Sequence, residues 1–327
     1  MSIIETLKQK LINSSKKPTI VYAEGWNVDI QAAAREVASN NTIKPFLIFH
    51  KQSEVPSNFN LPHIVIESAD LSTYSKLLFE LRKAKGLTEE QAQSLVKEPN
   101  FLASLIVKSG DADGEICGID YTTKDTLKPA LQIIKTAPGA KLVTSAFILE
   151  KGDAKYVCGD CAINLYPNSD ELANITKMIS LFAKHTAGFN EVRTAMLSYS
   201  TIGSGAGESV DKVRGAYDLI KNDSELLNNN IYIFGEMQFD AAFVEKVMVK
   251  KAKGITWKQP ANTFVFPNID AGNIGYKIAQ RMGGYNAIGP VLIGLALPVN
   301  DLSRGASKDD VVGLSYITGS QALHNLK

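Results

Sequence analysis

The chain has 327 residues, a formal net charge of +1 at pH 7 and a hydrophobic content of 45%. This length exceeds what one simple core usually holds, so we expect two domains. With 35 Lys and Arg against 34 Asp and Glu, the chain has no overall basic field, which argues against nucleic acid or an anionic membrane as a partner. Any anion must therefore be bound by a local arrangement of side chains.

Features of membrane and exported proteins are missing from the sequence. No apolar run reaches the roughly 18 to 20 residues that a membrane helix needs. The N-terminal residues MSIIETLKQKLINSSKK predict an amphipathic helix rather than a signal peptide. Cys117, Cys158 and Cys161 are too few, and odd in number, for a disulfide framework. These features predict a cytoplasmic protein.

Apolar runs rich in Val and Ile alternate with helical patterns along the whole chain, which predicts an α/β fold with parallel strands joined by crossover helices. The expected strands are 18–25, 45–50, 63–68, 115–118, 141–149, 193–200, 231–235, 262–266 and 291–297. The expected helices, after the N-terminal one, are 28–38, two within 73–96, 101–108, 125–135, 169–185, 209–220, 241–251, 271–282 and 308–323.

Polar motifs follow five of the expected strands. They are AEGWN (23–27), DYTTKDT (120–126), STIGSGAG (200–207), PNIDAGN (267–273) and NDLSRGAS (300–307). In open α/β sheets, ligands bind beyond the carboxyl ends of the strands. We therefore expect these five loops to line one cleft.

The segment PVNDLSRGASKDD concentrates the most chemistry. Ser303 has a neutral donor and acceptor, Arg304 has a planar fork that suits phosphate oxygens, and Asp310 has a carboxylate. Together they predict a phosphate-handling active site. A second interpretation of Asp310 is open, because Ser307 to Asp310 also has the pattern of a capping box at the start of a helix.

Three other motifs have structural alternatives. STIGSGAG lacks the Lys of a P-loop and the GxGxxG spacing, so a plain connecting loop is as probable as an anion-binding loop. In PNIDAGNIGYK, the residues Asn268, Asp270 and Asn273 suit helix capping as well as ligand contact. In CGDC, no second pair completes a zinc site, and structural cysteines are favoured over a metal site. We expect no metal.

Longer stretches of the chain resemble phosphate acetyltransferases, or phosphotransacetylases, which share a superfamily with phosphate butyryltransferases. The similar stretches are ELRKAKGLT, TLKPALQIIKTAPG, SYSTIGSGAG, GEMQFDAA, NTFVFPNIDAGNIGYKIAQRMGG and GPVLIGLALPVNDLSRGAS. They extend from about residue 80 to the C-terminus, and the similarity before that is weaker.

The resemblance implies reversible transfer of an acetyl group between coenzyme A and inorganic phosphate, by direct attack of the thiolate in a ternary complex. Coenzyme A is then a substrate, and no permanently bound cofactor is expected. The implied architecture has two α/β domains with an interdomain active-site cleft, like that of isocitrate and isopropylmalate dehydrogenases. Residues 1–142 and 292–327 form the first domain, and 143–291 form an inserted second domain. A homodimer is also implied.

By motif position, Asp310 resembles the family's base for the thiol, Ser303 its hydroxyl partner, and Arg304 its phosphate or carbonyl contact. We expect burial to raise the pKa of Asp310 toward that of the thiol. Arg82 resembles an arginine that binds coenzyme A. The further residues expected to contact coenzyme A or phosphate are Lys128, Thr122, Thr123, Ser204, Asn273 and Arg281.

The chain departs from the family pattern at three places. Lys128 stands where the family usually has Arg, and Lys lacks the bidentate fork, so weaker coenzyme A binding is expected. Ala23-Glu24-Gly25 is followed by Trp26 and Asn27 without the family's arginine. Tyr121-Thr122-Thr123 replaces the family's H-S-T and keeps the hydroxyl groups.

Three alternatives stay open. The first is a phosphate acyltransferase for butyryl or other short chains, because one methylene changes discrimination by only about 1 to 3 kcal/mol. The second is a metal- and nicotinamide-dependent hydroxyacid dehydrogenase on a similar scaffold, although no persuasive dinucleotide fingerprint is present. The third is a non-catalytic ligand-binding protein.

Overall fold

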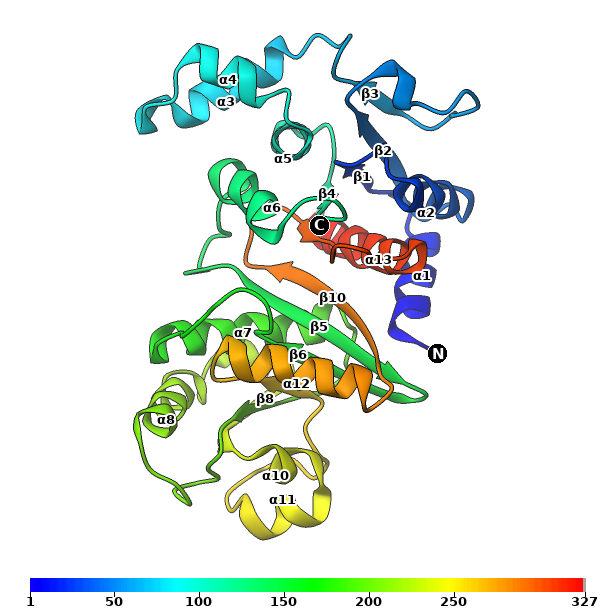
Figure 1. The fold of residues 1–327 in the computed structure, drawn as a ribbon. Helices are drawn as coiled ribbons and strands as arrows, with labels where there is room; N and C mark the ends of the chain where they lie inside the picture. The colour runs from blue at the N-terminus through cyan, green and yellow to red at the C-terminus, as the bar shows by residue number, and fades with distance from the viewer. Residues whose placement is uncertain (326–327) are drawn as a thin grey trace. The chain divides into compact units, whose positions relative to one another are not determined.

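The computed structural model describes residues 1–325 of the chain and divides them into two compact units (Figure 1). The N-terminal unit combines Ile4–Pro138 with the segment that begins at Leu295, and the inserted unit combines Met1–Ile3 with Gly139–Gly294. The sequence analysis places the limits of the domains at residues 142 and 292. Each unit has its own sheet, so the α/β fold class with two domains is confirmed.

The N-terminal unit has a five-stranded sheet in the order β11-β4-β1-β2-β3. Every neighbouring pair is parallel, as predicted. The strands are β1 (Thr19–Tyr22), β2 (Lys44–Phe49), β3 (His63–Val65), β4 (Gly114–Cys117) and β11 (Val299–Asp301). The short edge strand β11 was not predicted, because its three residues carry two polar side chains, Asn300 and Asp301, within a polar motif.

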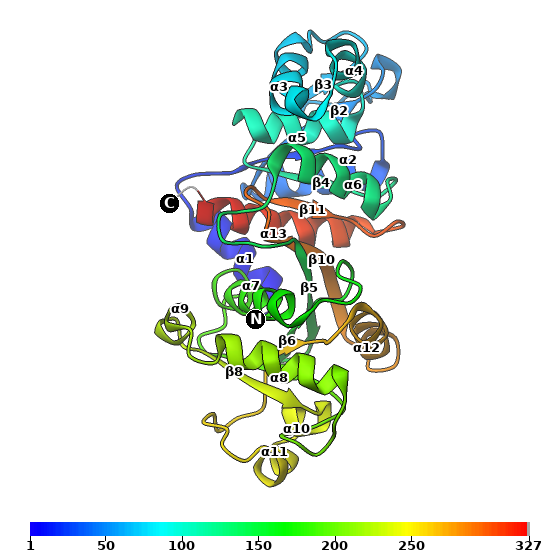
Figure 2. The same ribbon diagram turned by 90° about the vertical axis from the view of Figure 1, so that its left-hand side faces the viewer.

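Helices cover both faces of this sheet (Figures 1 and 2). Helices α2 and α13 pack together on one face, and α5 contacts β1, β2 and β4 from the other. The helices of the unit are α1 (Ile3–Asn13), α2 (Val28–Ser39), α3 (Ser72–Arg82), α4 (Glu89–Leu95), α5 (Pro99–Ser109), α6 (Thr123–Pro129) and α13 (Lys308–Asn325). Local signals set their ends: the Asn27 side chain caps α2, and α5 ends at Gly110, which adopts the left-handed conformation that favours glycine.

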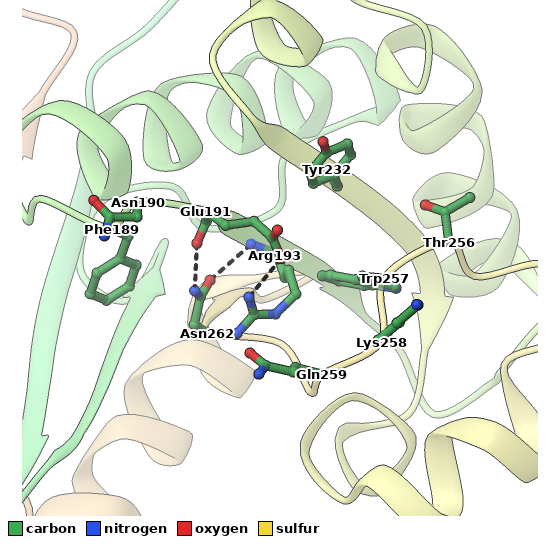
Figure 3. A pocket seen from close by; sticks show the side chains of 10 residues that line it. All are labelled: Phe189, Asn190, Glu191, Arg193, Tyr232, Thr256, Trp257, Lys258, Gln259 and Asn262. Atoms are coloured by element: carbon green, nitrogen blue, oxygen red, sulfur yellow. Dashed lines mark hydrogen bonds and ion pairs between the residues drawn. The ribbon is translucent and has the colours of Figure 1, made fainter.

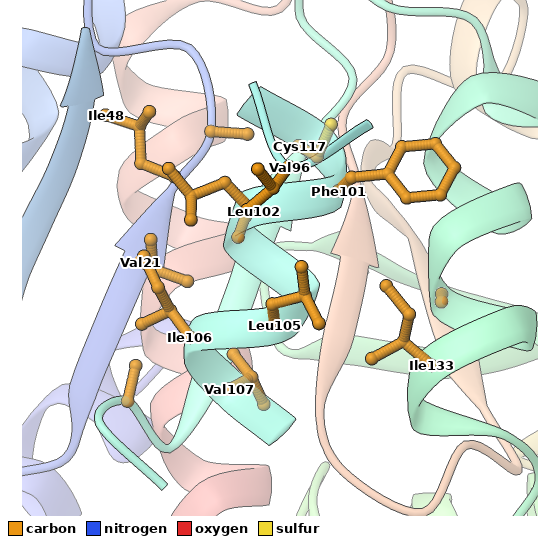
Figure 4. Packing of buried hydrophobic residues seen from close by; sticks show 14 of the residues in the cluster. Val21, Ile48, Val96, Phe101, Leu102, Leu105, Ile106, Val107, Cys117 and Ile133 are labelled. Carbon is orange, nitrogen blue, oxygen red and sulfur yellow. The ribbon is translucent and has the colours of Figure 1, made fainter. Parts of the chain in front are cut away.

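The core of the N-terminal unit lies between α5 and the sheet (Figure 4). Leu102 and Leu105 of α5 are fully buried against a cluster that includes Val21 of β1 and Ile48 of β2. Helix α5 is apolar around most of its circumference, because α3 and the 130–134 turn cover the side that faces away from the sheet. This packing holds the strands whose carboxyl ends carry the polar loops.

The inserted unit has a six-stranded sheet in the order β10-β5-β6-β9-β7-β8. The strands are β5 (Thr144–Lys151), β6 (Ala154–Gly159), β7 (Val192–Leu197), β8 (Ile231–Met237), β9 (Thr263–Val265) and β10 (Asn286–Ile293). The expectation of parallel pairing is wrong for β10 with β5 and for β5 with β6, which are antiparallel. Only Gly152 and Asp153 separate β5 from β6, and a connection this short joins antiparallel strands.

The helices of the inserted unit follow the predicted pattern except for the short helix over 224–228, which was not predicted, and for the segment 241–251. They are α7 (Ser169–His185), α8 (Glu208–Ile220), α9 (Ser224–Asn228), α10 (Phe239–Phe243), α11 (Glu245–Lys251) and α12 (Ile269–Arg281). The single helix expected over 241–251 is two short helices, because Val244 has extended backbone angles. Among the residues that the structure describes, no helix is long and apolar enough to cross a membrane.

Candidate active site

Three of the five polar loops meet at one edge of the N-terminal unit. Strands β1, β4 and β11 are adjacent and parallel, so the loops 23–27, 118–122 and 302–307 all leave the carboxyl edge of the sheet. The loops 200–207 and 267–273 follow β7 and β9, which are neighbours in the inserted unit. The polar loops therefore divide into a group of three and a group of two, one group in each unit.

Glu24 ties the first two loops of the N-terminal unit together. Its buried carboxylate accepts hydrogen bonds from four successive backbone N–H groups, at 2.9 Å from Gly118, 3.3 Å from Ile119, 2.7 Å from Asp120 and 3.1 Å from Tyr121. Burial raises the pKa of Glu24, and the backbone donors partly offset that rise. The carboxylate thus fixes the shape of the 118–121 loop. The sequence analysis assigned no role to Glu24, although an acid directly after a buried strand is a recognisable signal.

Asp301 makes the corresponding link between the second loop and the third. It is the last residue of β11 and is 1% exposed. Its Oδ2 accepts a hydrogen bond from Thr123 Oγ1 at 2.7 Å. Burial raises the pKa of Asp301 to about 6, and the hydroxyl groups of Thr123 and Thr126 offset only part of the rise. Asp301 is not among the predicted site residues, because its burial depends on the neighbouring strand and loop and not on the motif itself.

The two threonines expected to contact substrate use their hydroxyl protons inside the protein. Thr123 donates to Asp301. Thr122 caps α6: its Oγ1 accepts from the N–H of Asp125 at 3.2 Å and donates to Asp125 Oδ2 at 2.6 Å. This hydrogen bond holds the pKa of Asp125 below its ordinary value. In this conformation the two hydroxyls have only lone pairs left, and they order the loop rather than donate to an anion.

Ser303, Arg304 and Asp310 lie on the third loop and the first turn of α13, and all three are exposed. The expected burial of Asp310 is wrong. Its Oδ2 accepts from the N–H of Ser307 at 2.9 Å and from the Ser307 hydroxyl at 2.7 Å, while its own N–H donates to Ser307 Oγ at 3.4 Å. These are the reciprocal bonds of a capping box, and the first turn of α13 turns this side chain toward solvent.

The cationic side chains expected to bind substrate are available in the N-terminal unit. Within residues 1–325, no hydrogen bond or ion pair engages the guanidinium of Arg304 or that of Arg82, the last residue of α3. Lys128 is exposed on α6, and its Nζ lies 5.7 Å from the centre of the Phe101 ring. Each of these groups can pair with an anion without breaking an internal ion pair.

In the inserted unit, the 200–207 loop is organised around Glu236 of β8. The buried carboxylate accepts from the N–H of Gly203 at 2.8 Å and from Ser200 Oγ at 2.9 Å. The hydroxyl oxygen of Ser204 accepts from the N–H of Thr201 at 2.9 Å. Because these donors point inward, the glycine-rich loop is shaped by its own contacts. The Ser204 side chain stays exposed at its surface.

The 267–273 loop has the capping role that the sequence left open. Asn268 caps α12 by accepting from the N–H of Ala271 at 3.0 Å. Asn273 donates from Nδ2 to the carbonyl of Cys161 at 3.1 Å, which joins α12 to the CGDC segment. Arg281 is exposed in the last turn of the same helix.

The cysteines behave as structural residues. Cys117, Cys158 and Cys161 are free and buried. Burial raises the pKa of all three thiols, that of Cys158 to about 12, so none is activated as a nucleophile. In the described part of the chain, no group of three His, Cys, Asp or Glu side chains is arranged to hold a metal ion.

A cavity of about 790 Å³ lies at the opposite edge of the inserted unit's sheet (Figure 3). Its lining includes Glu191, Arg193 and Asn262, which stand at the amino ends of β7 and β9. Arg193 is engaged by the Pro260 carbonyl at 2.8 Å and by Glu191 at 2.8 Å. None of the expected site residues lines this cavity, and ligands of open α/β sheets bind at the carboxyl edge.

Comparison with known proteins agrees with the resemblance. The family model described as Phosphate acetyl/butaryl transferase matches residues 2–319. A phosphate acetyltransferase of Mycoplasma genitalium is 48% identical over 325 residues, 99% of this chain and 100% of that protein. Two solved structures each cover 98% of both chains: the EutD phosphotransacetylase from Staphylococcus aureus (TM-score 0.89, 41% identity) and a phosphotransacetylase from Streptococcus pyogenes (TM-score 0.90, 37% identity). The chain therefore belongs to the phosphate acetyl/butaryl transferase family, a family of acyltransferases.

Proposed function

We propose that the chain is a phosphate acetyltransferase, which transfers an acetyl group reversibly between coenzyme A and inorganic phosphate. The observation that carries the proposal is the full-length similarity to curated phosphate acetyltransferases, together with a carboxyl edge that presents Ser303 and Arg304. The thiolate of coenzyme A attacks the carbonyl of acetyl phosphate directly in a ternary complex. Phosphate then leaves as a stable anion, so the step needs no activated water.

Arg304 is the proposed partner of the phosphate group. Its guanidinium has no internal partner in the described chain and presents a planar fork to oxygen pairs. Ser303 lies beside it in the sequence, and its hydroxyl is the proposed donor to the developing oxyanion. The Arg82 and Lys128 side chains supply positive charge for the phosphates of coenzyme A. The proposed contacts in the inserted unit are Ser204, Asn273 and Arg281.

Asp310 is the proposed base for the thiol, and its environment sets a condition on that role. A free thiol with a pKa of ~8.5 and a free carboxylate of ~3.9 differ by about 4.6 units, or roughly 6 kcal/mol. In this structure Asp310 is exposed and hydrogen-bonded to Ser307. Bound coenzyme A must therefore remove water from Asp310 for proton transfer to become favourable.

The test of the function is direct. Purified protein is mixed with coenzyme A and acetyl phosphate, and the thioester absorbance is followed in the presence of a chelator and without a nicotinamide cofactor. We expect acetyl-CoA to form at rates typical of enzymes, about 1 to 1,000 per second. Butyryl phosphate in the same assay separates an acetyl enzyme from a butyryl enzyme. Failure of both acyl phosphates to react would contradict the proposal.

We also propose a cytoplasmic homodimer. Three free thiols suit a reducing compartment. The inserted unit exposes several large apolar side chains on α10 and α12, of a kind that a second copy would cover: Phe239, Ile274, Ile278 and Met282. Light scattering at several concentrations measures the mass of the particle. A stable monomer at all of them would contradict the dimer.

A further inference from the structure

Asp301 stands where two loops of the N-terminal unit begin. It ends β11, pairs in register with Cys117 of β4, and precedes Ser303 by two residues. The N–H of the next residue, Leu302, donates to the Cys117 carbonyl at 2.7 Å. The loop that carries Ser303 and Arg304 therefore starts from a fixed point on the sheet.

The carboxylate of Asp301 reaches across to the neighbouring loop. Its hydrogen bond from Thr123 joins residues that are 178 positions apart in the sequence. Thr123 is the first residue of α6 and lies two residues after Tyr121, the last residue whose backbone N–H donates to Glu24. Glu24 thus joins the first loop of the carboxyl edge to the second, and Asp301 joins the second loop to the third.

Close packing leaves the Asp301 carboxylate little freedom. A Cβ atom placed on Gly118 would lie 2.3 Å from Asp301 Oδ1 and 2.8 Å from the nitrogen of Leu302. Gly118 also has a φ of +111°, which side chains rarely adopt. The glycine therefore admits the carboxylate to this position and permits the turn beside it.

Burying the Asp301 carboxylate costs folding free energy, so its presence is not explained by a contribution to stability. Among the described residues, the buried Asp301 carboxylate has the hydroxyl groups of Thr123 and Thr126 as partners and forms no ion pair. A buried carboxylate that is incompletely paired destabilises the folded state, and a neutral side chain of the same shape costs less. Burial raises the pKa of Asp301 to about 6, so the group is mostly ionised at neutral pH. The charge strengthens the hydrogen bonds from the threonine hydroxyls, and the bond from Thr123 is the one that reaches the start of α6.

We infer that Asp301 is a positioning residue of the acyl transfer, which acts through Thr123 to hold the 118–123 loop against the Ser303–Arg304 loop. This inference rests on the proposed function. Arg304 itself is exposed and unpaired, so its placement depends on the backbone that carries it. A catalytic group that is misplaced by about 1 Å can cost about 100-fold in rate.

The experiment is a double-mutant cycle with Asp301→Asn, Thr123→Val and the pair of changes. We expect each single change to lower kcat about tenfold and the double change to lower it little further, because both act through one hydrogen bond. The KM for coenzyme A should change less than twofold. Asp301→Asn should also raise Tm at pH 8, because it removes a buried charge. A gain in Tm with a loss of kcat is not the result of simple unfolding.

Thr42→Val is the matched control in the same unit. Thr42 is buried and donates to the Val37 carbonyl at 2.7 Å, just before β2 begins at the amino edge of the sheet. Its loss should lower Tm and leave kcat unchanged. If Asp301→Asn does not fold, the kcat of Thr123→Ser is compared with that of Thr123→Val. Serine keeps the hydroxyl donor, so Thr123→Ser should recover most of the turnover that Thr123→Val loses.

Losses of kcat that simply multiply in the double variant, or wild-type kcat in Asp301→Asn, overturn the role of Asp301. So does Thr123→Ser if it is as slow as Thr123→Val. The wild-type assay is measured first: if it forms no acetyl-CoA, the proposed function fails, and the role of Asp301 fails with it. If the wild type is active but the losses of kcat in the two single variants multiply in the double variant, only the positioning role of Asp301 is contradicted.

Discussion

The guanidinium of Arg214 donates two hydrogen bonds to the buried carboxylate of Glu236, each with an N–O distance of 3.1 Å. Glu236 is 2% exposed, whereas Arg214 is 43% exposed. Burial opposes ionisation of Glu236, but Arg214 and the N–H of Gly203 more than offset it and hold its pKa below the ordinary value. The 200–207 loop therefore depends on a carboxylate that must stay ionised.

Arg214→Met should lower the denaturant midpoint of the protein, because it leaves the buried Glu236 carboxylate without its charged donor. The lowered pKa means that this contribution is present at neutral pH and is lost as the pH falls through the acid range. Denaturant midpoints at pH 7 measure the change. Lys221→Met is the control at the C-cap of the same helix: it breaks an exposed pair with Asp218, which should contribute little to stability. Equal effects of the two changes would contradict the prediction.

Asp310→Asn should lower kcat by at least about 100-fold and change KM little, because a general base acts mainly in the transition state. An amide oxygen can still accept from Ser307, so the helix cap survives and Tm should stay close to the wild-type value. Asp309→Asn is the control, because Asp309 is its exposed neighbour and pairs only with Lys308. Steady-state kinetics in both substrates measure the effect. Unchanged turnover in Asp310→Asn refutes the base role.

Lys128→Arg should lower the KM for coenzyme A by a few fold, because Arg contacts two phosphate oxygens where Lys contacts one. Stacking of the guanidinium on Phe101, which already lies 5.7 Å from the ammonium group, supports the new side chain. Lys124→Arg is the control on the same helix. The KM for coenzyme A is measured at saturating acetyl phosphate. The idea fails if the Lys128 variant and the control give the same value.

Glu115→Gln should make the stability of the protein less dependent on pH. Glu115 is fully buried in β4, and burial raises its pKa to about 8, against the opposing hydrogen bond from Ser104 at 2.7 Å. The folded chain keeps this proton between pH 4.5, the ordinary value, and pH 8, whereas the unfolded chain loses it. Stability therefore falls through this window, by at most about 1.4 kcal/mol per pH unit.

Thermal melts at several pH values between 5 and 9 measure this effect. The fall in Tm with rising pH should be shallower in Glu115→Gln than in the wild type. Glu89→Gln, an exposed change in the first turn of α4, is the control and should keep the wild-type slope. Equal changes of Tm with pH in the wild type and in Glu115→Gln would contradict the raised pKa of Glu115.

The sequence by itself determined the elements whose signals are local. Helix α7 was predicted with its observed limits, Ser169–His185, because its apolar period repeats within neighbouring turns; the structure adds a capping box at Asn168. The capping roles of Asn268 and of the Ser307–Asp310 segment were also open from the sequence as alternatives. The fold class and the family followed from the same kind of information, because both depend on the order of residues along the chain.

Only the tertiary structure decided which loops share an edge and which acids are buried. Strand β6 and its antiparallel pairing with β5 were not predicted, although β5 itself was, and the five polar loops proved to belong to two sheets. Glu24 and Asp301 look like ordinary loop acids in the sequence, yet burial and distant partners give them their roles. Asp310, which the sequence made prominent, is exposed. Burial depends on what packs against a residue from far along the chain, and no local pattern contains that information.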